Sequence, residues 1–329
     1  VVACLFFGAI SGSSPATVAA IGGIMIPYMV REGYSKEFAT GLSAVSGSLG
    51  IIIPPSIPFV IYGIATNSNI GTLFIAGFGP GIMIGIALIV VSRFICKKRG
   101  YLGTERKSTG KEKLQAINEA KWALIMPLII LGGIYGGIFT STEAAAVAIF
   151  YSLFVGFFVY KELKWKDVFS ILDTTASFVG AVMLAFAPAA ALGAVLSMLG
   201  VPGMVSDLLL SISSNIYVIM FIVMLVLIVA GMILDTISAI VLLAPILSGA
   251  LIPMGIDPIH LGTVMIVALA IGFVTPPVAQ NLFVASGMTG LPMHKIVKEA
   301  FPFIVTMLVC LVLITFFPEI SLALPTLLS

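Results

Sequence analysis

Two Gly…Pro-Pro segments stand in matching parts of this chain and carry residues suited to holding an ion. The first is Gly50-Ile51-Ile52-Ile53-Pro54-Pro55, and the second is Gly272-Phe273-Val274-Thr275-Pro276-Pro277. A glycine followed by two prolines breaks a helix and removes two backbone donors. Carbonyl oxygens of unwound helix can coordinate a desolvated cation, and a half-helix N-terminus offers N–H groups to a carboxylate. The pair predicts two helix breaks with a shared binding role.

Small polar residues accompany the first break. Ser11, Gly12, Ser13 and Ser14 form one group, and Ser46-Gly47-Ser48-Leu49-Gly50 forms another. Hydroxyl and carbonyl oxygens here predict ligands for one cation, although glycine and serine also allow tight packing of helices in lipid. We favour the binding interpretation because Pro15 and the proline pair break helices that packing alone would leave intact.

An acidic residue accompanies the second break. Asp235 stands in the middle of an apolar run of about 38 residues, and a carboxylate inside a membrane is typical of a functional site. The alternative, compatible with ion binding, is a cap on the following helix. The predicted cluster comprises Asp235, Thr236, Ser238, Gly272, Thr275, Pro276 and Pro277. Asn281 either contacts substrate or holds the second break in place.

The remaining polar residues point to no catalytic centre. Glu143 follows Thr140 at helix-capping distance, and His260 and His294 stand alone. No phosphate-binding loop, zinc spacing or Ser/His/Asp arrangement is legible, and one embedded acid without a partner argues against an intramembrane protease. We therefore expect a protein that is not an enzyme.

Composition indicates a membrane protein. Of 329 residues, 60% are hydrophobic and only 9% are charged, against about 25% charged in soluble domains. The mean hydropathy is +1.21. At about 20 residues per span, the length allows roughly eight to ten crossings. The fold class expected is an all-α polytopic membrane protein.

The apolar segments are interrupted in a repeated order. A span over 1–30 is broken at 11–15, and 36–49 with 56–66 flank the first Pro-Pro pair. A span over 215–252 is broken at 235–236, and 258–271 with 278–290 flank the second pair. The segments around each pair are short, so we predict two re-entrant helical hairpins with Pro-Pro tips. The other expected spans are 72–96, 122–140, 143–160, 168–199 with a possible break at 187–189, and 294–317.

Spacing and charge predict how these units are oriented. Gly33 precedes Gly50 by 17 residues, as Gly255 precedes Gly272, and the intervening spans make this an inverted-topology repeat. Positive charges place 97–121, 161–166 and the Lys295/Lys298 end in the cytoplasm. We expect 97–121 to be a loop with a short amphipathic helix. The loop 31–37 is expected outside, so that the first hairpin enters from outside and the second from the cytoplasm; a cytoplasmic 31–37 would invert the first.

At these residues the sequence resembles the large membrane subunit of the tripartite ATP-independent periplasmic (TRAP) transporters. The similarity runs the whole length and is most specific at the Pro-Pro segments. The stretches that carry it are Ile10 to Ala20, Leu49 to Ser56, Ser141 to Ala146, and Gly272 to Val278 with Asn281-Leu282. The family's subunit has further membrane helices before the position of Val1, so we expect residues to precede it.

The resemblance implies sodium-coupled import of an organic acid anion, such as a C4-dicarboxylate or sialic acid, across the bacterial inner membrane. It implies a small four-helix membrane subunit and a periplasmic substrate-binding protein as partners, a lipid bilayer as surroundings, and no nucleic acid. It also implies an elevator mechanism. Residues 1–66 and 215–290 would then form the transport domain, and 67–214 and 291–329 mainly the scaffold.

Carried onto this chain, the family pattern implies two or more Na⁺ ions. Their ligands would come from Ser11, Ser13, Ser14, Ser46, Ser48, Gly50, Asp235, Thr236, Gly272, Thr275 and Pro276. Gly12, Ser56, Ser238 and Asn281 would face the substrate. Two other classes stay open: a dicarboxylate symporter that works without a binding protein, and an ion channel.

Overall fold

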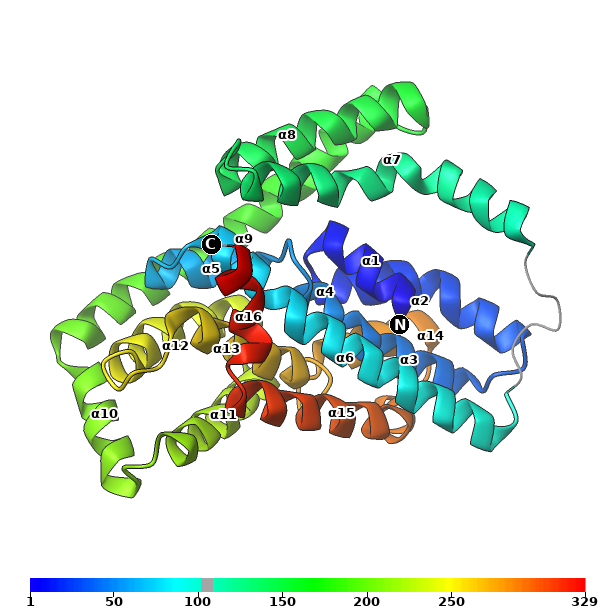
Figure 1. The fold of residues 1–329 in the computed structure, drawn as a ribbon. Helices are drawn as coiled ribbons and strands as arrows, with labels where there is room; N and C mark the ends of the chain where they lie inside the picture. Colours follow the sequence, from blue (N-terminus) through cyan, green and yellow to red (C-terminus); the bar gives the residue numbers. More distant parts are fainter. Residues whose placement is uncertain (102–108, 329) are drawn as a thin grey trace. The chain divides into compact units, whose positions relative to one another are not determined.

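The computed structural model describes residues 1–101 and 109–328, and every regular element in these ranges is helical (Figure 1). Six helices are long and apolar enough to cross a membrane, or seven if one bent pair counts as a single span. The all-α polytopic class expected from composition is confirmed. The chain divides into two compact units, residues 1–104 with 189–329, and residues 105–188.

The first unit begins with a helical hairpin. Helix α1 (Val2–Ser11) ends where Gly12 adopts a left-handed conformation with φ of 60°, and α2 (Ser14–Arg31) starts after the extended Ser13. The first residues of α1 and the later turns of α2 line one cavity of about 340 Å³, so the two helices are antiparallel. The chain therefore reverses at the polar residues 11–14.

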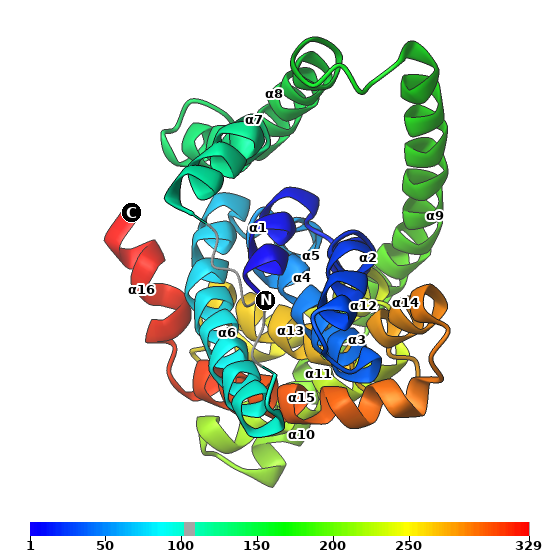
Figure 2. The same ribbon diagram turned by 90° about the vertical axis from the view of Figure 1, so that its right-hand side faces the viewer.

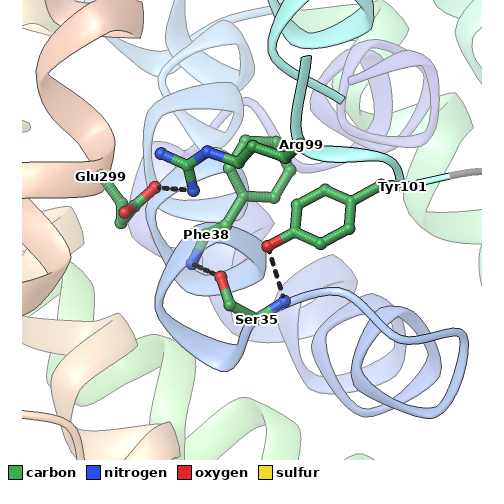
Figure 3. Close-up of polar contacts among 5 residues, drawn as sticks. All are labelled: Ser35, Phe38, Arg99, Tyr101 and Glu299. Carbon is green, nitrogen blue, oxygen red and sulfur yellow. Dashed lines mark hydrogen bonds and ion pairs between the residues drawn. The ribbon is translucent and has the colours of Figure 1, made fainter. Parts of the chain in front are cut away.

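The first Pro-Pro break lies in a segment that crosses the unit. Helices α3 (Lys36–Gly47) and α4 (Leu49–Ile52) precede the break, α5 (Ile57–Thr66) follows it, and the bend is 40°. Helix α6 (Ile70–Arg99) then runs back for about 45 Å. The start of α3 lies at the end of α6, because Ser35 N–H donates to the Tyr101 hydroxyl at 3.3 Å and Phe38 lies under Arg99 (Figure 3). The predicted re-entrant hairpin over 36–66 is therefore wrong.

The second Pro-Pro break also lies in a crossing segment. Helix α13 (Pro258–Gly272) begins where the Pro258 carbonyl accepts from the Tyr62 hydroxyl of α5 at 2.7 Å. Helix α14 (Gln280–Thr289) ends where the Thr289 carbonyl accepts from the Lys36 ammonium. The segment 258–289 thus runs opposite to 36–66, and the hairpin predicted there is wrong too. A proline pair interrupts helical hydrogen bonding but does not by itself reverse the chain. Packing against long neighbouring helices keeps each segment running in one direction.

A second hairpin precedes this crossing segment. Near the start of helix α11 (Ile216–Ile233), the Tyr217 ring lies tilted against Phe316, the last residue of α15 (Met293–Phe316), with ring centroids 6.1 Å apart. Helix α12 (Thr236–Leu251) ends beside Pro258, because Ile256 N–H donates to the Leu251 carbonyl. Both outer ends therefore lie at the same end of the unit, and the chain reverses at 234–235. Both crossing segments pack against α6 and α15, which also contact each other (Figures 1 and 2).

One end of this unit collects its positive charge. Arg99 at the end of α6 pairs with Glu299 near the start of α15 at 2.6 Å, beside Ser35 and Tyr101 (Figure 3). We call this the basic end, and its lysines and arginines lead us to expect that it faces the cytoplasm. The prediction that 31–37 lies on the opposite side from the start of 97–121 is wrong, because both lie at this end. Glu32 and Glu37 had masked the positive charge of Arg31 and Lys36. The hairpin 1–31 thus enters from the basic end, and 216–251 enters from the opposite end.

Two short helices complete the unit. Helix α10 (Val201–Ile212) precedes α11, and α16 (Glu319–Leu328) follows α15. His260 Nδ1 lies 2.8 Å from Ser321 Oγ, and this buried contact fixes α16 to the start of α13. Neither helix was expected, because each is too short for a span.

The second unit contains the helices between α6 and α10, except that residues 189–198 at the end of the last of them belong to the first unit. Helix α7 (Gly110–Tyr135) replaces the short surface helix expected within 97–121, of which 102–108, with Arg106 and Lys107, lie outside the described residues. Helix α8 (Ser141–Phe154) continues as a π-helix (Val155–Val159), and Glu143 makes the expected capping box with Thr140. Helix α9 (Trp165–Met198) runs unbroken through Pro188, so the break predicted at 187–189 is wrong. Long helices tolerate a proline when only one hydrogen bond is lost.

Candidate ion and substrate site

The tip of the first hairpin packs against the first broken span. Ser11 Oγ lies 3.0 Å from Thr17 Oγ1, which donates to the Ser13 carbonyl at 2.8 Å. A Cβ atom on Gly50 would lie 2.4 Å from Thr17 Oγ1 and 2.7 Å from the Ser13 carbonyl oxygen. Only glycine allows this approach, so Ser11, Ser13 and Gly50 come together as predicted.

Asn281 joins this tip to the second broken span. Its carboxamide exchanges hydrogen bonds with the Ser14 hydroxyl, at 2.8 and 3.0 Å. The same amide nitrogen lies 3.0 Å from the Ala44 carbonyl and 3.2 Å from Ser48 Oγ. All of these contacts are buried, and Asn281 itself is fully enclosed. Asn281 therefore has protein partners on both sides of its amide, which favours the holding role over direct substrate contact.

Asp235 caps the helix that follows the second tip. Its Oδ1 accepts from Ile237 N–H at 2.8 Å, and its Oδ2 accepts from the Ser238 hydroxyl at 2.6 Å. This is the capping arrangement weighed from the sequence. Ser238 is thereby directed to Asp235. A carboxylate oxygen has more than one lone pair, so the cap is compatible with a further ligand.

The two halves repeat one backbone arrangement at their breaks. In the first, Ile57 N–H donates to the Gly12 carbonyl at 3.3 Å; in the second, Val278 N–H donates to the Met232 carbonyl at 3.2 Å. Each donor closely follows a cis Pro-Pro bond, and each acceptor lies at a hairpin tip. Glycines meet beside both contacts: a Cβ on Gly8 would lie 2.8 Å from Gly50 Cα, and one on Gly272 would lie 2.2 Å from the Gly231 carbonyl carbon.

Two buried hydroxyls in the described part of the chain have no hydrogen-bond partner. They are Ser46 Oγ and Thr236 Oγ1, and both residues are at most 3% exposed. One belongs to each predicted ion cluster. A buried hydroxyl without a partner costs about 1–3 kcal/mol. Such a cost is expected at a site that completes its coordination with a ligand.

A comparison with known families decides where the chain belongs. The DctM component of the tripartite ATP-independent periplasmic transporters matches residues 1–320. The chain belongs to this family. As a member it is a transporter permease, not an enzyme, and an integral protein of the bacterial inner membrane. The fold described above is thus a DctM fold, with its hairpin tips at 11–14 and 234–235.

Individual DctM relatives cover most of the chain. The C4-dicarboxylate TRAP transporter large permease protein of Pseudomonas aeruginosa is 41% identical over 99% of this chain and 76% of its own length. The sialic acid TRAP transporter large permease protein of Vibrio cholerae is 38% identical over 99% of this chain and 76% of its length. The isethionate TRAP transporter permease protein DctMQ of Oleidesulfovibrio alaskensis is 43% identical over 97% of this chain, which spans 50% of that relative.

The other predicted residues of this DctM chain have simpler surroundings. Ser56 is buried and donates to the Ile51 carbonyl at 2.7 Å, and Thr275 Oγ1 donates to the Ile271 carbonyl at 2.7 Å. Pro276 is exposed. Gly12 faces the first break, where a Cβ would lie 2.9 Å from the Pro55 carbonyl oxygen. The backbone of Gly12 therefore lies close to the break, whereas the Ser56 hydroxyl is already engaged with the Ile51 carbonyl. Gly12 fits the predicted site better than Ser56 does.

Sequence reasoning missed several residues that complete the two helix breaks. Thr17 completes the first tip, and its place one helical turn after Ser13 was the available signal. Gly8, Gly231 and Met232 had no such signal, because their contacts come from segments some 40 residues away along the chain.

Proposed function

We propose that this chain carries out sodium-coupled import of a small organic acid anion as the membrane subunit of a tripartite transporter. The observation that supports it best is the pair of buried hydroxyls without partners, Ser46 and Thr236, one beside each helix break. Two sites built from hydroxyl and carbonyl oxygens suit a hard monovalent cation. In this proposal Na⁺ is cargo, and its electrochemical gradient across the membrane drives uptake of the anion.

Three half-helices support an anionic substrate. The N-caps of α2, α5 and α14 are Ser13, Ser56 and Ala279, and none makes a side-chain hydrogen bond to its helix. The Ile57 and Asn281 N–H groups already donate to the Gly12 and Phe273 carbonyls, and the other first-turn N–H groups would offer a partial positive charge to a carboxylate. The N-terminus of α12 differs because Asp235 already caps it. The anion would therefore bind nearer α2, α5 and α14.

The substrate class and partners follow from the relatives. Those named above are permeases for C4-dicarboxylates, sialic acid and isethionate, all organic anions. We propose the same class for this chain, together with a small membrane subunit and a periplasmic binding protein. The runner-up is a symporter that needs no binding protein, and a channel is a third possibility.

We also propose that transport moves one body against another. The family resemblance implied that 1–66 and 215–290 form the mobile part. Because α6 and α15 belong to the same compact unit as both crossing segments, we extend the mobile part to include them. In this elevator mechanism the two hairpins enter the membrane from opposite ends of the unit. Each hairpin would close the binding site toward one side of the membrane.

Uptake into proteoliposomes tests the proposal. The permease with its small subunit is reconstituted, and a panel of labelled organic acids is supplied with and without Na⁺ and the binding protein. Saturable uptake that requires both supports the proposal. Uptake without the binding protein supports the symporter, and unsaturable flux with conductance supports the channel.

A further inference from the structure

We infer that Asn281 couples the two cation sites, so that binding of one ion strengthens binding of the other. This inference rests on the proposed function, because it concerns the same sites. Its basis is a set of contacts that links Ala44 and Ser48, on either side of Ser46, through Asn281 to Met232, which precedes Thr236 by four residues. Sequence alone assigned Asn281 either to substrate or to holding the second break.

The first part of this path joins Asn281 to the first site. Its amide nitrogen contacts the Ala44 carbonyl and Ser48 Oγ, two residues on either side of Ser46 on α3. Its amide also holds Ser14, the first residue of α2 after the hairpin tip. An ion that draws Ser46 Oγ into its coordination shell must fix the end of α3. The position of α3 then fixes the carboxamide.

The second part joins Asn281 to the second site through the backbone. Its N–H donates to the Phe273 carbonyl at 3.0 Å, across the Pro276-Pro277 break. Beside Phe273, Gly272 packs on Gly231, and Val278 holds the Met232 carbonyl, four residues before Thr236. A shift of Asn281 therefore shifts the break and the second tip together.

Burial makes this connection stiff. Asn281, Ser14 and Ser48 are fully enclosed, and Ala44 and Gly272 are buried. Within close-packed surroundings, a displaced amide would leave several buried groups unpaired, so intermediate positions are costly. The Asn281 carboxamide and its partners should therefore switch between two arrangements rather than move continuously. Ion binding at either site would favour the same arrangement. Coupling of this kind is reciprocal and is typically worth 5–150-fold in affinity.

A mutant cycle on purified permease tests the inference without transport. The measurement is the half-maximal Na⁺ concentration for binding, that is, the apparent dissociation constant fitted to the rise in thermal stability with Na⁺. It is made for Ser46→Ala, Thr236→Val and the double variant, each with Asn281 and with Asn281→Ala. With Asn281 present, we expect the two single effects to be non-additive by roughly tenfold. With Asn281→Ala, we expect them to be additive. Gln280→Ala, on the neighbouring half-buried residue, should leave the non-additivity unchanged.

The possible failures are distinct. If the non-additivity is the same with Asn281→Ala, the coupling role of Asn281 is wrong while the two sites stand. If neither single substitution shifts the half-maximal Na⁺ concentration, the sodium sites are wrong and the coupling is wrong with them. If Asn281→Ala gives no folded protein by size exclusion, the cycle is run with Asn281→Ser, whose hydroxyl can reach fewer of the partners and should reduce the coupling.

Discussion

The Lys36 ammonium donates to the Thr289 carbonyl at 2.6 Å, across 253 residues of chain. Lys36 begins the first crossing segment, and Thr289 ends the second. The contact therefore sets the two Pro-Pro segments side by side in opposite directions. Each segment is broken near its middle, and each break faces a hairpin tip that enters from a different end of the unit.

The unpartnered hydroxyls predict an unusual response to substitution. Ser46→Ala and Thr236→Val should leave thermal stability without Na⁺ unchanged or slightly raised, because each removes a buried polar group that costs about 1–3 kcal/mol. Both should reduce the stabilisation that Na⁺ provides. The measurement is a thermal melt over a range of NaCl, with choline chloride holding ionic strength constant.

Thr263→Val is the matched control for these variants. Thr263 is equally buried, but its hydroxyl donates to the Ile259 carbonyl at 2.9 Å. Its substitution should lower stability slightly and leave Na⁺ protection intact. Full Na⁺ protection in both Ser46→Ala and Thr236→Val would remove these hydroxyls from the site.

The close contact between Gly231 of α11 and Gly272 of α13 predicts that adding a methyl group at Gly272 strongly destabilises the protein. Gly272→Ala would place a methyl group 2.2 Å from the Gly231 carbonyl carbon. Backbone cannot move aside as a side chain can, so we expect at least the 1–3 kcal/mol typical of overpacking. Gly287→Ala is the control, because no atom lies within 4 Å of its added Cβ. Equal melting temperatures for the two variants would argue against the close contact.

Two substitutions at Asp235 can separate its role as a helix cap from the effect of its negative charge. Asp235→Asn keeps an oxygen for the Ile237 N–H but removes the negative charge, whereas Asp235→Ala removes both. We expect Asp235→Ala to lose about 1 kcal/mol of stability through the lost cap, and Asp235→Asn to lose less. Both should reduce sodium-dependent uptake if the charge contributes to the ion site. Wild-type uptake in Asp235→Asn would restrict Asp235 to its capping role.

The basic end predicts a shifted tyrosine titration. Hydrogen bonding by Ser35, first through its side chain and then through its N–H, acts together with the nearby Arg99 to lower the pKa of Tyr101 below its usual value of 10. Ionised Tyr101 therefore stabilises the fold, an effect that is full above the unfolded pKa and lost as pH falls through the folded one. A difference titration of tyrosinate absorbance between wild type and Tyr101→Phe should show this early ionisation. Arg99→Gln should move it to higher pH.

Sequence patterns located the helix breaks but not the direction of the chain beyond them. Proline, glycine and capping residues act locally, so the ends of α1, α5, α11 and α13 were predicted within a few residues. Whether a chain crosses or returns after a break depends on distant neighbours, here α6 and α15 along the crossing segments. The same limit applies to the site: Ser11, Ser13 and Gly50 were predicted together, whereas the path through Asn281 joins residues 267 positions apart.

The cap on Asp235 bears on how a carrier resets. After releasing its substrate, a carrier must return to the outward-facing conformation without it, and a carboxylate without hydrogen-bond partners in hydrocarbon would oppose that step. In this chain the Asp235 carboxylate accepts hydrogen bonds from the Ile237 N–H and the Ser238 hydroxyl, which belong to the helix that it caps. These two donors would accompany the carboxylate through the return step and would lower the cost of moving its charge.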